Sequence, residues 1–371
     1  MRSSFNIALA TIFVLLWFTS MSLPTARSAS PVDGAALYGA ACAACHGSDG
    51  RGRTPEQLGF DLPLPDFTDC SFNSREASAD WFTLTHEGGP VRAFSPIMPA
   101  FGSALSREEI EAVVEYTKEF CTDASWPRGE LNLPRAMFTE KAYPEDEAVL
   151  TFDYASGGAD GQSTLIWEKR FGARGQLELI LPFASAQDAA GERHHGIGDI
   201  AIGTKYAFAH NFQGGRIWAV GAELALPTGD AQRGLGNPDA GGELYLAFGQ
   251  ALPSDAFIQS RLLVEGPLRS SATQEAALQL VVGKTWIAPE YGRSWTPMLE
   301  IIGNRELEQG VDGEWSLVPQ LQVSLSLRQH VLLSIGASLP MDHRDRRDTR
   351  VLAYVLWDWY DGGLSQGWRK E

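Results

Sequence analysis

Two cysteines and a histidine near the start of the chain have the types and spacing of a covalent cofactor site. In the stretch YGAACAACHGSDGRG, Cys42, Cys45 and His46 form the pattern C-x-x-C-H, the attachment motif of c-type haem. On a helix, residues three apart share a face, so both thiols reach one porphyrin while the adjacent imidazole reaches the iron. A zinc site would need a second ligand pair, which the sequence lacks. A thioredoxin-type redox site would need a βαβ context, whereas residues 33–50 predict a small-residue helix ending in a glycine-rich loop.

A six-coordinate haem iron needs a second axial ligand, and the sequence offers two candidates. Met98 lies in the proline-containing stretch FSPIMPAFG, fifty-two residues after His46. His86, in LTHEGG, lies at the end of an expected helix over residues 76–86, where a surface or capping histidine is an ordinary finding. We favour Met98 over His86. Methionine–histidine ligation raises the reduction potential and leaves no open coordination position, which suits electron transfer rather than oxygen chemistry.

The stretch SREEIEAVVEYTKEF predicts the helix that closes this domain. Ser106 and Glu109 have the spacing of a capping box. The apolar face of the expected helix comprises Ile110, Val113, Val114, Thr117 and Phe120. We expect this face to pack across the first helix near Leu37 and Tyr38.

Together, the CAACH motif, the IMPAF loop and the closing helix resemble a class I monohaem cytochrome c over residues 31–122. The resemblance implies a small all-α domain that carries one covalent haem c. It also implies thioether bonds to Cys42 and Cys45, with His46 as the proximal ligand and Met98 as the distal ligand of the iron.

The remaining cysteines, Cys70 and Cys121, complete the four in the chain. In an exported protein two spare cysteines most simply form a disulfide, here closing a loop of about 50 residues. Two free buried thiols are the alternative.

The N-terminus predicts export. Arg2 precedes an apolar stretch over residues 7–18, and Ala26-Arg27-Ser28 offers a cleavage site, so residues 1–28 read as a signal peptide. The alternative is an uncleaved anchor, but about 20 apolar residues are needed to span a bilayer and this stretch is shorter. Export places the chain in a compartment that tolerates disulfides.

The chain is strongly acidic, with a formal net charge of −16, which argues against nucleic acid as a partner. Residues 33–123 alone contain fifteen Asp or Glu and six Lys or Arg. Ordinary solubility would explain this excess. The functional interpretation is a periplasmic redox partner with a basic docking face.

Residues 123–146 contain prolines at 127 and 134 and no sustained period, so we expect a linker. From residue 147 to residue 371 the pattern alternates with a period of two, as in LVPQLQVSLSLR. Twelve strands are predicted, at 147–154, 163–171, 175–183, 197–209, 215–226, 242–252, 255–265, 275–287, 294–304, 314–328, 331–340 and 350–360. Short and long connections alternate between them, which is typical of an antiparallel bacterial outer-membrane β-barrel in contact with lipid. A β-sandwich or propeller is the alternative.

An even number of strands with short turns after the even ones places both ends of the barrel on the turn side, and hence the cytochrome domain in the periplasm. Charged residues expected at strand positions facing a lumen are Glu178, Asp199, Lys205, Glu223, Arg261, Glu300 and Arg328. Tryptophans near strand ends, as in interfacial girdles, are Trp167, Trp218, Trp286, Trp295, Trp315 and Trp357. His194 and His195 are expected in a solvent-facing loop.

The stretches GIGDIAIGTKYAF and GAELALPTGD resemble outer-membrane transporter barrels of the MetA-pathway type, and the whole architecture resembles fused cytochrome–porin proteins. That resemblance implies electron transfer by a haem held at the periplasmic side of the barrel, linked to extracellular or pore-borne redox chemistry. The alternative is a solute channel or an anchor with an appended cytochrome. A haem enzyme is a third reading, with no catalytic residues to nominate.

Overall fold

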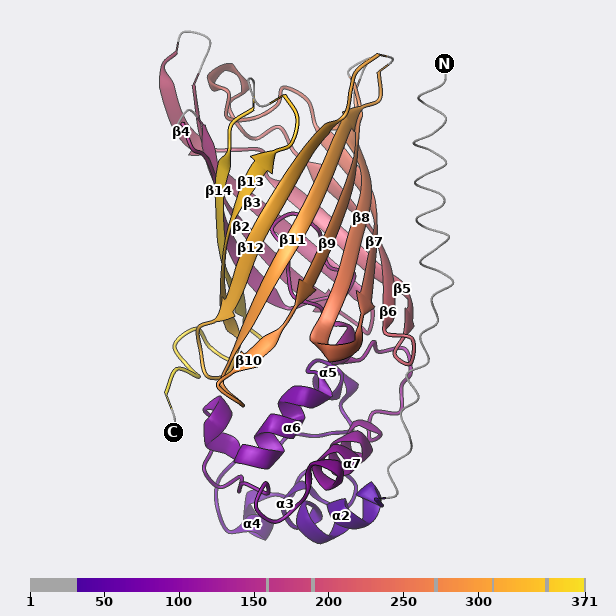
Figure 1. The fold of residues 1–371 in the computed structure, drawn as a ribbon. Helices are drawn as coiled ribbons and strands as arrows, with labels where there is room; N and C mark the ends of the chain where they lie inside the picture. Colours follow the sequence, from indigo (N-terminus) through magenta and orange to yellow (C-terminus); the bar gives the residue numbers. More distant parts are fainter. Residues whose placement is uncertain are drawn as a thin grey trace.

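The computed structural model describes residues 32–157, 160–187, 191–269, 273–308, 310–343 and 347–369. The expected signal peptide, residues 1–28, lies outside these ranges. A small helical domain is followed by a closed antiparallel barrel, and the helical domain lies beneath one open end of the barrel (Figure 1). Among the residues described, no helix has the length and apolar character needed to cross a membrane.

The helical domain is built from short helices joined by glycine-rich and proline-rich loops. They are α2 (Gly34–Ala41), α3 (Ala43–His46), α4 (Pro55–Leu58), α5 (Cys70–Asn73), α6 (Ser78–Glu87), the 3₁₀ turn η1 (Gly89–Arg92) and α7 (Arg107–Lys118). The capping box expected at the start of α7 is present, since Ser106 and Glu109 bond each other's backbone N–H groups.

The first and last helices of this domain cross in close contact, as predicted. The ring of Tyr38 on α2 packs 5.4 Å from that of Tyr116 and 5.2 Å from that of Phe120. At the crossing, a Cβ added to Gly34 would lie 2.3 Å from the carbonyl oxygen of Ala112. Only glycine permits this approach of the two backbones.

Twelve strands close the barrel, as predicted. They are β1 (Glu147–Ala155), β2 (Gly161–Phe171), β3 (Gly175–Gln187), β5 (Ala201–Asn211), β6 (Arg216–Ala225), β7 (Gly241–Ala251), β8 (Ala256–Pro267), β9 (Glu275–Lys284), β11 (Arg293–Glu306), β12 (Glu314–Ser324), β13 (Val331–Pro340) and β14 (Arg350–Asp358). The strand β4 (Arg193–Ile197) extends β3, and β10 (Trp286–Ala288) extends β9 along β11. Pairing of β1 with β14 completes the ring, with Glu147 opposite Asp358. Short 3₁₀ turns lie at η2 (Gly129–Leu131), η3 (Ala231–Arg233) and η4 (Pro253–Asp255).

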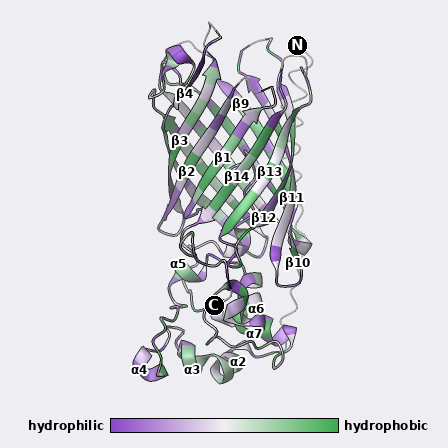
Figure 2. Cartoon of the chain, turned by 90° about the vertical axis from the view of Figure 1, so that its left-hand side faces the viewer, coloured by the Kyte–Doolittle hydropathy of each residue, from purple (hydrophilic) through white to green (hydrophobic). Residues whose placement is uncertain are grey.

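The period-two pattern places apolar side chains outside and polar side chains inside. On β12, Leu321 is exposed, whereas its neighbours Gln320 and Gln322 are buried. Figure 2 shows hydrophobic and hydrophilic residues alternating along the strands of the barrel. Exposed outward-facing residues include Leu150, Leu165, Trp167, Leu179, Phe183, Ile202, Val220, Leu244, Leu262, Val282, Trp295, Leu299, Trp315, Ile335 and Val351. A closed barrel with an apolar outer band pairs its backbone internally, which is the requirement for a sheet that spans a membrane. The sandwich and propeller alternatives are therefore wrong.

The segment expected as a linker enters the barrel. Residues 139–147 are all buried, and the backbone and side chains of this segment bond lumen-facing residues around the circumference. Arg135 donates to Glu147 on β1 at 2.8 Å and to Glu168 on β2 at 2.7 Å. The further lumen partners are Gln176 on β3, Lys205 on β5, Gln259 on β8, Glu300 on β11 and Tyr354 on β14. The segment between the two domains therefore lies in the lumen and is not an extended linker. Its charged side chains are paired there with charged residues of the strands.

Four positions differ from their predicted settings. Arg328 was expected on a strand facing the lumen, but β12 ends at Ser324 and Arg328 lies in the turn to β13, on the side of the helical domain. Asp199 lies between β4 and β5, where Asp199 accepts from the backbone of Gly229 and Asn237 in a neighbouring loop. His194 and His195 belong to β4 rather than to a loop, because β3 continues beyond the barrel wall as a hairpin.

Candidate haem site

The two cysteines and the histidine of the C-x-x-C-H motif lie where two helices meet. Cys42 separates α2 from α3, and Cys45 and His46 belong to the single turn of α3. The N–H groups of Cys45 and His46 donate to the carbonyl of Cys42 at 3.1 and 2.9 Å, which holds the three side chains within one helical turn. Both thiols are free and half-buried. Burial, with a smaller contribution from Cys45, raises the pKa of the Cys42 thiol to about 11.

The imidazole of His46 lies against the ring of Phe67, with the ring centres 4.9 Å apart. Burial lowers the pKa of His46, which keeps the ring in the neutral form that binds metals. Its Nδ1 atom is buried and has no hydrogen-bond partner. An imidazole in this state is suited to be a metal ligand.

Met98 lies in a loop whose backbone is tied to α6. The N–H of Gly89 donates to the carbonyl of Met98 at 3.0 Å, and the N–H of Phe101 donates to that of Thr85 at 3.0 Å. Gly88 ends α6 at φ +82°, a left-handed setting that favours glycine and turns the chain into this loop.

Cys42, Cys45, His46 and Met98 all line one cavity of about 990 Å³. Its other walls in the helical domain are mainly apolar and include Phe60, Leu64, Phe67, Trp81, Leu84 and Val113. Two thiols one helical turn apart, a neutral imidazole, a thioether and an apolar slot fit a c-type haem. The cavity continues past Arg92 and Phe94 to the mouth of the barrel, where Arg328 and Asp358 also line it.

His86, the competing ligand, does not line this cavity. Its Nδ1 lies 2.7 Å from the carboxylate of Glu87. The imidazole ring stacks between Phe82 and Tyr291, with centres 5.7 and 4.8 Å away. Tyr291 belongs to the turn before β11, so His86 contributes to the contact between the domains rather than to the cavity.

Cys70 and Cys121 are joined by a disulfide in the structure. This bond ties the start of α5 to the segment that follows α7. Asn73 supports the same junction, because its amide donates to the carbonyls of Phe67 and Thr117 at 2.7 and 3.0 Å.

Two family models match the chain in separate parts. Residues 29–116 match "Cytochrome C oxidase, cbb3-type, subunit III", and residues 149–257 match "Putative MetA-pathway of phenol degradation". The helical domain is a cytochrome c-type domain. In this chain it precedes a twelve-stranded barrel of the outer-membrane type.

The cytochrome domain is 34% identical over 104 residues to chloroplastic cytochrome c6 of Chlamydomonas reinhardtii, a match that covers 27% of this chain and 64% of that protein. The KustC0563 c-type cytochrome is 28% identical, with 24% of this chain and 100% of that chain covered and a TM-score of 0.21. The NanC porin is 8% identical, with 57% of this chain and 98% of that chain covered and a TM-score of 0.42.

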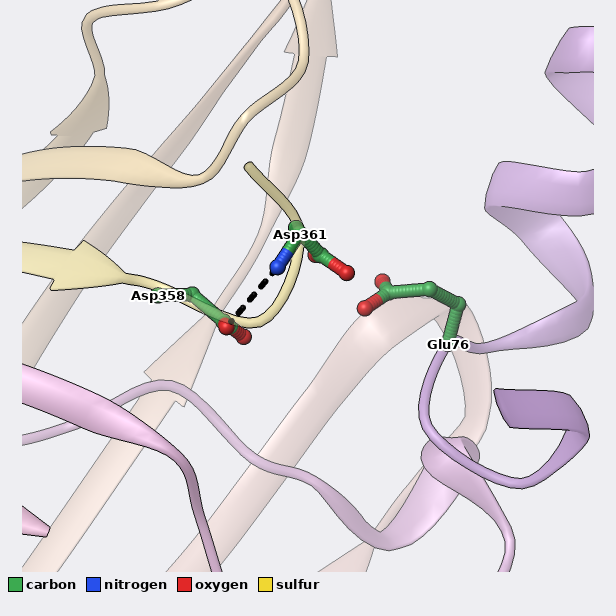
Figure 3. A group of neighbouring side chains, drawn as sticks. All are labelled: Glu76, Asp358 and Asp361. Atoms are coloured by element: carbon green, nitrogen blue, oxygen red, sulfur yellow. Dashed lines mark hydrogen bonds between the residues drawn. The ribbon is translucent and has the colours of Figure 1, made fainter. Parts of the chain in front are cut away.

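Three carboxyl groups meet where the cytochrome domain touches the barrel. Glu76 precedes α6, Asp358 ends β14, and Asp361 follows it; their oxygens lie within 4.8 Å of one another (Figure 3). The N–H of Asp361 donates to Asp358 at 3.4 Å, while the carboxyl of Asp361 turns toward Glu76. Burial, and then repulsion from Asp80, raises the pKa of Glu76, and burial with repulsion from Glu76 and Asp358 raises that of Asp361. These groups therefore hold protons at a pH where free carboxyls would be ionised.

Residues 134–147 lie in the lumen and are called the lumen segment below. The sequence analysis did not identify them as lumen residues. Glu140 lies 2.5 Å from Lys205, and Thr139 donates to Glu300 at 2.6 Å from both its backbone and its hydroxyl. One signal was present in the sequence, since residues 140–147 carry five charges in a stretch that otherwise has no period. Buried charges require partners, and the lumen charges predicted on the strands supply them.

Proposed function

We propose that this protein is an electron carrier anchored in the bacterial outer membrane, with its cytochrome domain in the periplasm. Cys42 and Cys45 hold one haem c covalently, and His46 and Met98 are the axial ligands of its iron. The observation that carries the proposal is that these four side chains line a single apolar cavity beneath the barrel. The bound haem supplies a one-electron couple at that position.

The residues of this chain support electron transfer rather than substrate chemistry. With His46 and Met98 both holding the iron, a bound haem would have no coordination position open to a substrate. The imidazole of His46 is neutral and the walls of the cavity are apolar. Little water therefore has to rearrange around the site when the haem gains or loses an electron.

The lumen segment supports anchoring over transport. Arg135, Glu140 and Thr139 bind partners on strands around the barrel, so the described part of the lumen is crossed by the chain itself. A solute would have to displace several buried ion pairs. A conduit to the outside would need a further redox centre, since the outer apolar band is about 25 Å tall in such barrels.

The partner of the carrier is proposed to be a periplasmic redox protein with a basic face. Exposed acidic side chains on the cytochrome domain are Asp33, Asp49, Glu56, Asp61, Asp69, Glu87, Glu108, Glu111, Glu119 and Asp123. Complementary charge of this kind raises the rate of encounter and makes that rate depend on ionic strength.

Axial ligation is tested by two substitutions in the full-length protein. Met98→Ala is expected to produce a five-coordinate, high-spin spectrum and a lower midpoint potential. His86→Ala is the matched control and leaves the spectrum unchanged, because His86 lies outside the cavity. Loss of the low-spin spectrum in His86→Ala alone would reverse the assignment.

Direction of electron flow is tested in sealed vesicles with the protein in one known orientation. A membrane-impermeant reductant is expected to reduce the haem only from the side of the cytochrome domain. Reduction from the side of the long loops at a similar rate would contradict the anchored carrier and establish a conduit.

A further inference from the structure

Two arginine side chains line the cavity that holds the four haem-attaching residues, one from each domain. Arg92 comes from η1, six residues before Met98, and is only 5% exposed. Arg328 comes from the barrel turn between β12 and β13. Its guanidinium carbon lies 4.3 Å from the ring centre of Phe94, and its Nη2 donates to the carbonyl of Ala93 at 2.7 Å. The barrel thus reaches the start of the loop that carries Met98.

Each of the two guanidinium groups keeps one donor without a partner. The Nε atoms of Arg92 and Arg328 are buried without a hydrogen-bond partner. Arg92 forms a long ion pair with the partly exposed Asp80 at 3.4 Å, and its Nη1 donates to the carbonyl of Tyr291 at 2.9 Å. Within the described part of the chain, Arg328 forms no ion pair, and its guanidinium donates to the backbone carbonyls of Ala93 and Asp361 at 2.7 and 3.1 Å.

The other charges along the same cavity already have partners. Arg135 is paired with Glu147 and Glu168 at 2.8 and 2.7 Å, and Lys141 with Glu145 at 2.5 Å. At the carboxyl cluster, the cation that acts on Asp358 and Asp361 is Arg75. Among the described residues, Arg328 is therefore the Lys or Arg side chain of this cavity that forms no ion pair, and Arg92 has only its long pair with Asp80.

The anions that a haem brings to its pocket are its two propionates. A guanidinium offers five N–H donors in a planar fork that matches a carboxylate, and such pairs are strongest when shielded from water. A buried cation is costly unless paired. Two guanidinium groups that line a cavity with two thiols, an imidazole and a thioether, each with one donor still unpaired, have the chemistry of a propionate site.

We propose that Arg92 and Arg328 are the propionate-binding residues of the haem, so that a turn of the barrel completes the pocket of the cytochrome domain. This inference rests on the proposed haem attachment. Arg328 makes the barrel part of the redox site, because its cation stabilises the reduced state of the site and raises its midpoint potential. The contact between the cytochrome domain and the barrel and the midpoint potential of the haem then both depend on the side chain of Arg328.

The test uses full-length protein in detergent, with Arg92→Gln, Arg328→Gln and the double variant. The matched control is Arg293→Gln, an exposed arginine at the start of β11 on the same end of the barrel. Each of the first two substitutions is expected to lower the midpoint potential, and the double variant to lower it further, while Arg293→Gln leaves it unchanged. The propionate-bending band in the resonance Raman spectrum should shift in the first two and not in the control.

A merely structural role for Arg328 would weaken docking without moving the propionate band. An unshifted band in both single variants, or an equal fall of potential in Arg293→Gln, would overturn the proposal. If the Gln variants do not fold, Arg328→Lys keeps the charge but not the fork, and an intermediate shift is expected. A wild-type band at the position of free propionates would also overturn it. Absence of covalent haem in the wild type would instead refute the proposed function itself.

Discussion

Arg75 of the cytochrome domain and Asp146 at the foot of the barrel form an ion pair of 2.6 Å, with their side chains 10% and 1% exposed. The guanidinium of Arg75 also lies 3.5 Å from the ring centre of Tyr360, just beyond β14. A pair this deeply buried between two domains means that the cytochrome is docked on the barrel rather than tethered beside it.

Breaking the pair between Arg75 and Asp146 should weaken docking. We expect Arg75→Gln to cost about 3–5 kcal/mol, because Asp146 would stay buried with less compensating charge. The measurement is urea unfolding of the cytochrome domain in the full-length protein, followed by haem circular dichroism. The control is Arg51→Gln, which removes a pair with Asp66 that is 62% and 41% exposed and should cost less than about 1 kcal/mol. Equal costs for the two variants would contradict a docked interface.

The lumen segment should keep the barrel closed to ions. Wild-type protein in planar bilayers is expected to show no steady current, because Arg135 and Glu140 hold the segment to the wall. The double substitution Arg135→Ala and Glu140→Ala removes both attachments and should raise single-channel conductance. Arg233→Ala, in an exposed pair with Asp230 outside the barrel wall, serves as the control. A large wild-type conductance would argue for a solute channel.

Rising pH should loosen the contact at Glu76 and Asp361. Their pKa values are raised in the folded protein, so the folded state binds more protons than the unfolded chain above the ordinary carboxyl pKa of about 4. Their contribution to stability is complete below that pH and is lost as pH rises toward the raised values.

Glu76→Gln and Asp361→Asn should therefore make the unfolding free energy less dependent on pH above the ordinary carboxyl pKa of about 4. The same urea titration at several pH values measures this, with the fully exposed Glu56→Gln as the control. An unchanged pH profile in both variants would show that the cluster is ionised in the folded state.

Lys118 should give the cytochrome domain an opposite dependence at higher pH. Its ammonium donates to the carbonyls of Asn73 and Glu76 at 2.6 and 2.7 Å and lies 4.0 Å from the ring centre of Trp81. Burial lowers the pKa of Lys118 from 10.5 to about 8. Between these values the unfolded chain binds more protons than the folded domain, so stability rises with pH.

Lys118→Met should abolish that rise and cost about 1–3 kcal/mol near neutral pH, because two buried carbonyls lose their donor. The margin of the wild type over this variant should widen as pH rises from about 8 to 10.5. A constant margin over that range would show that the pKa of Lys118 is ordinary.

The local patterns were enough to predict most of the elements. A three-residue spacing on a helix brings Cys42, Cys45 and His46 together whatever surrounds them, and a capping box at Ser106 marks the start of α7 by local hydrogen bonds alone. Alternation with a period of two separates the lumen face from the outer face of the barrel strands. Twelve strands with an apolar exterior can satisfy their backbone only as a closed ring.

What the sequence by itself determined is therefore the local chemistry of the C-x-x-C-H motif, the strand count and the face of each strand. The tertiary structure decided the path of residues 123–146 and the position of Arg328. Both depend on partners distant in sequence: Glu168 and Lys205 for the lumen segment, and Ala93, 235 residues away, for Arg328. A buried charge is tolerated only where its partner lies, and periodicity contains no information about where the chain brings that partner.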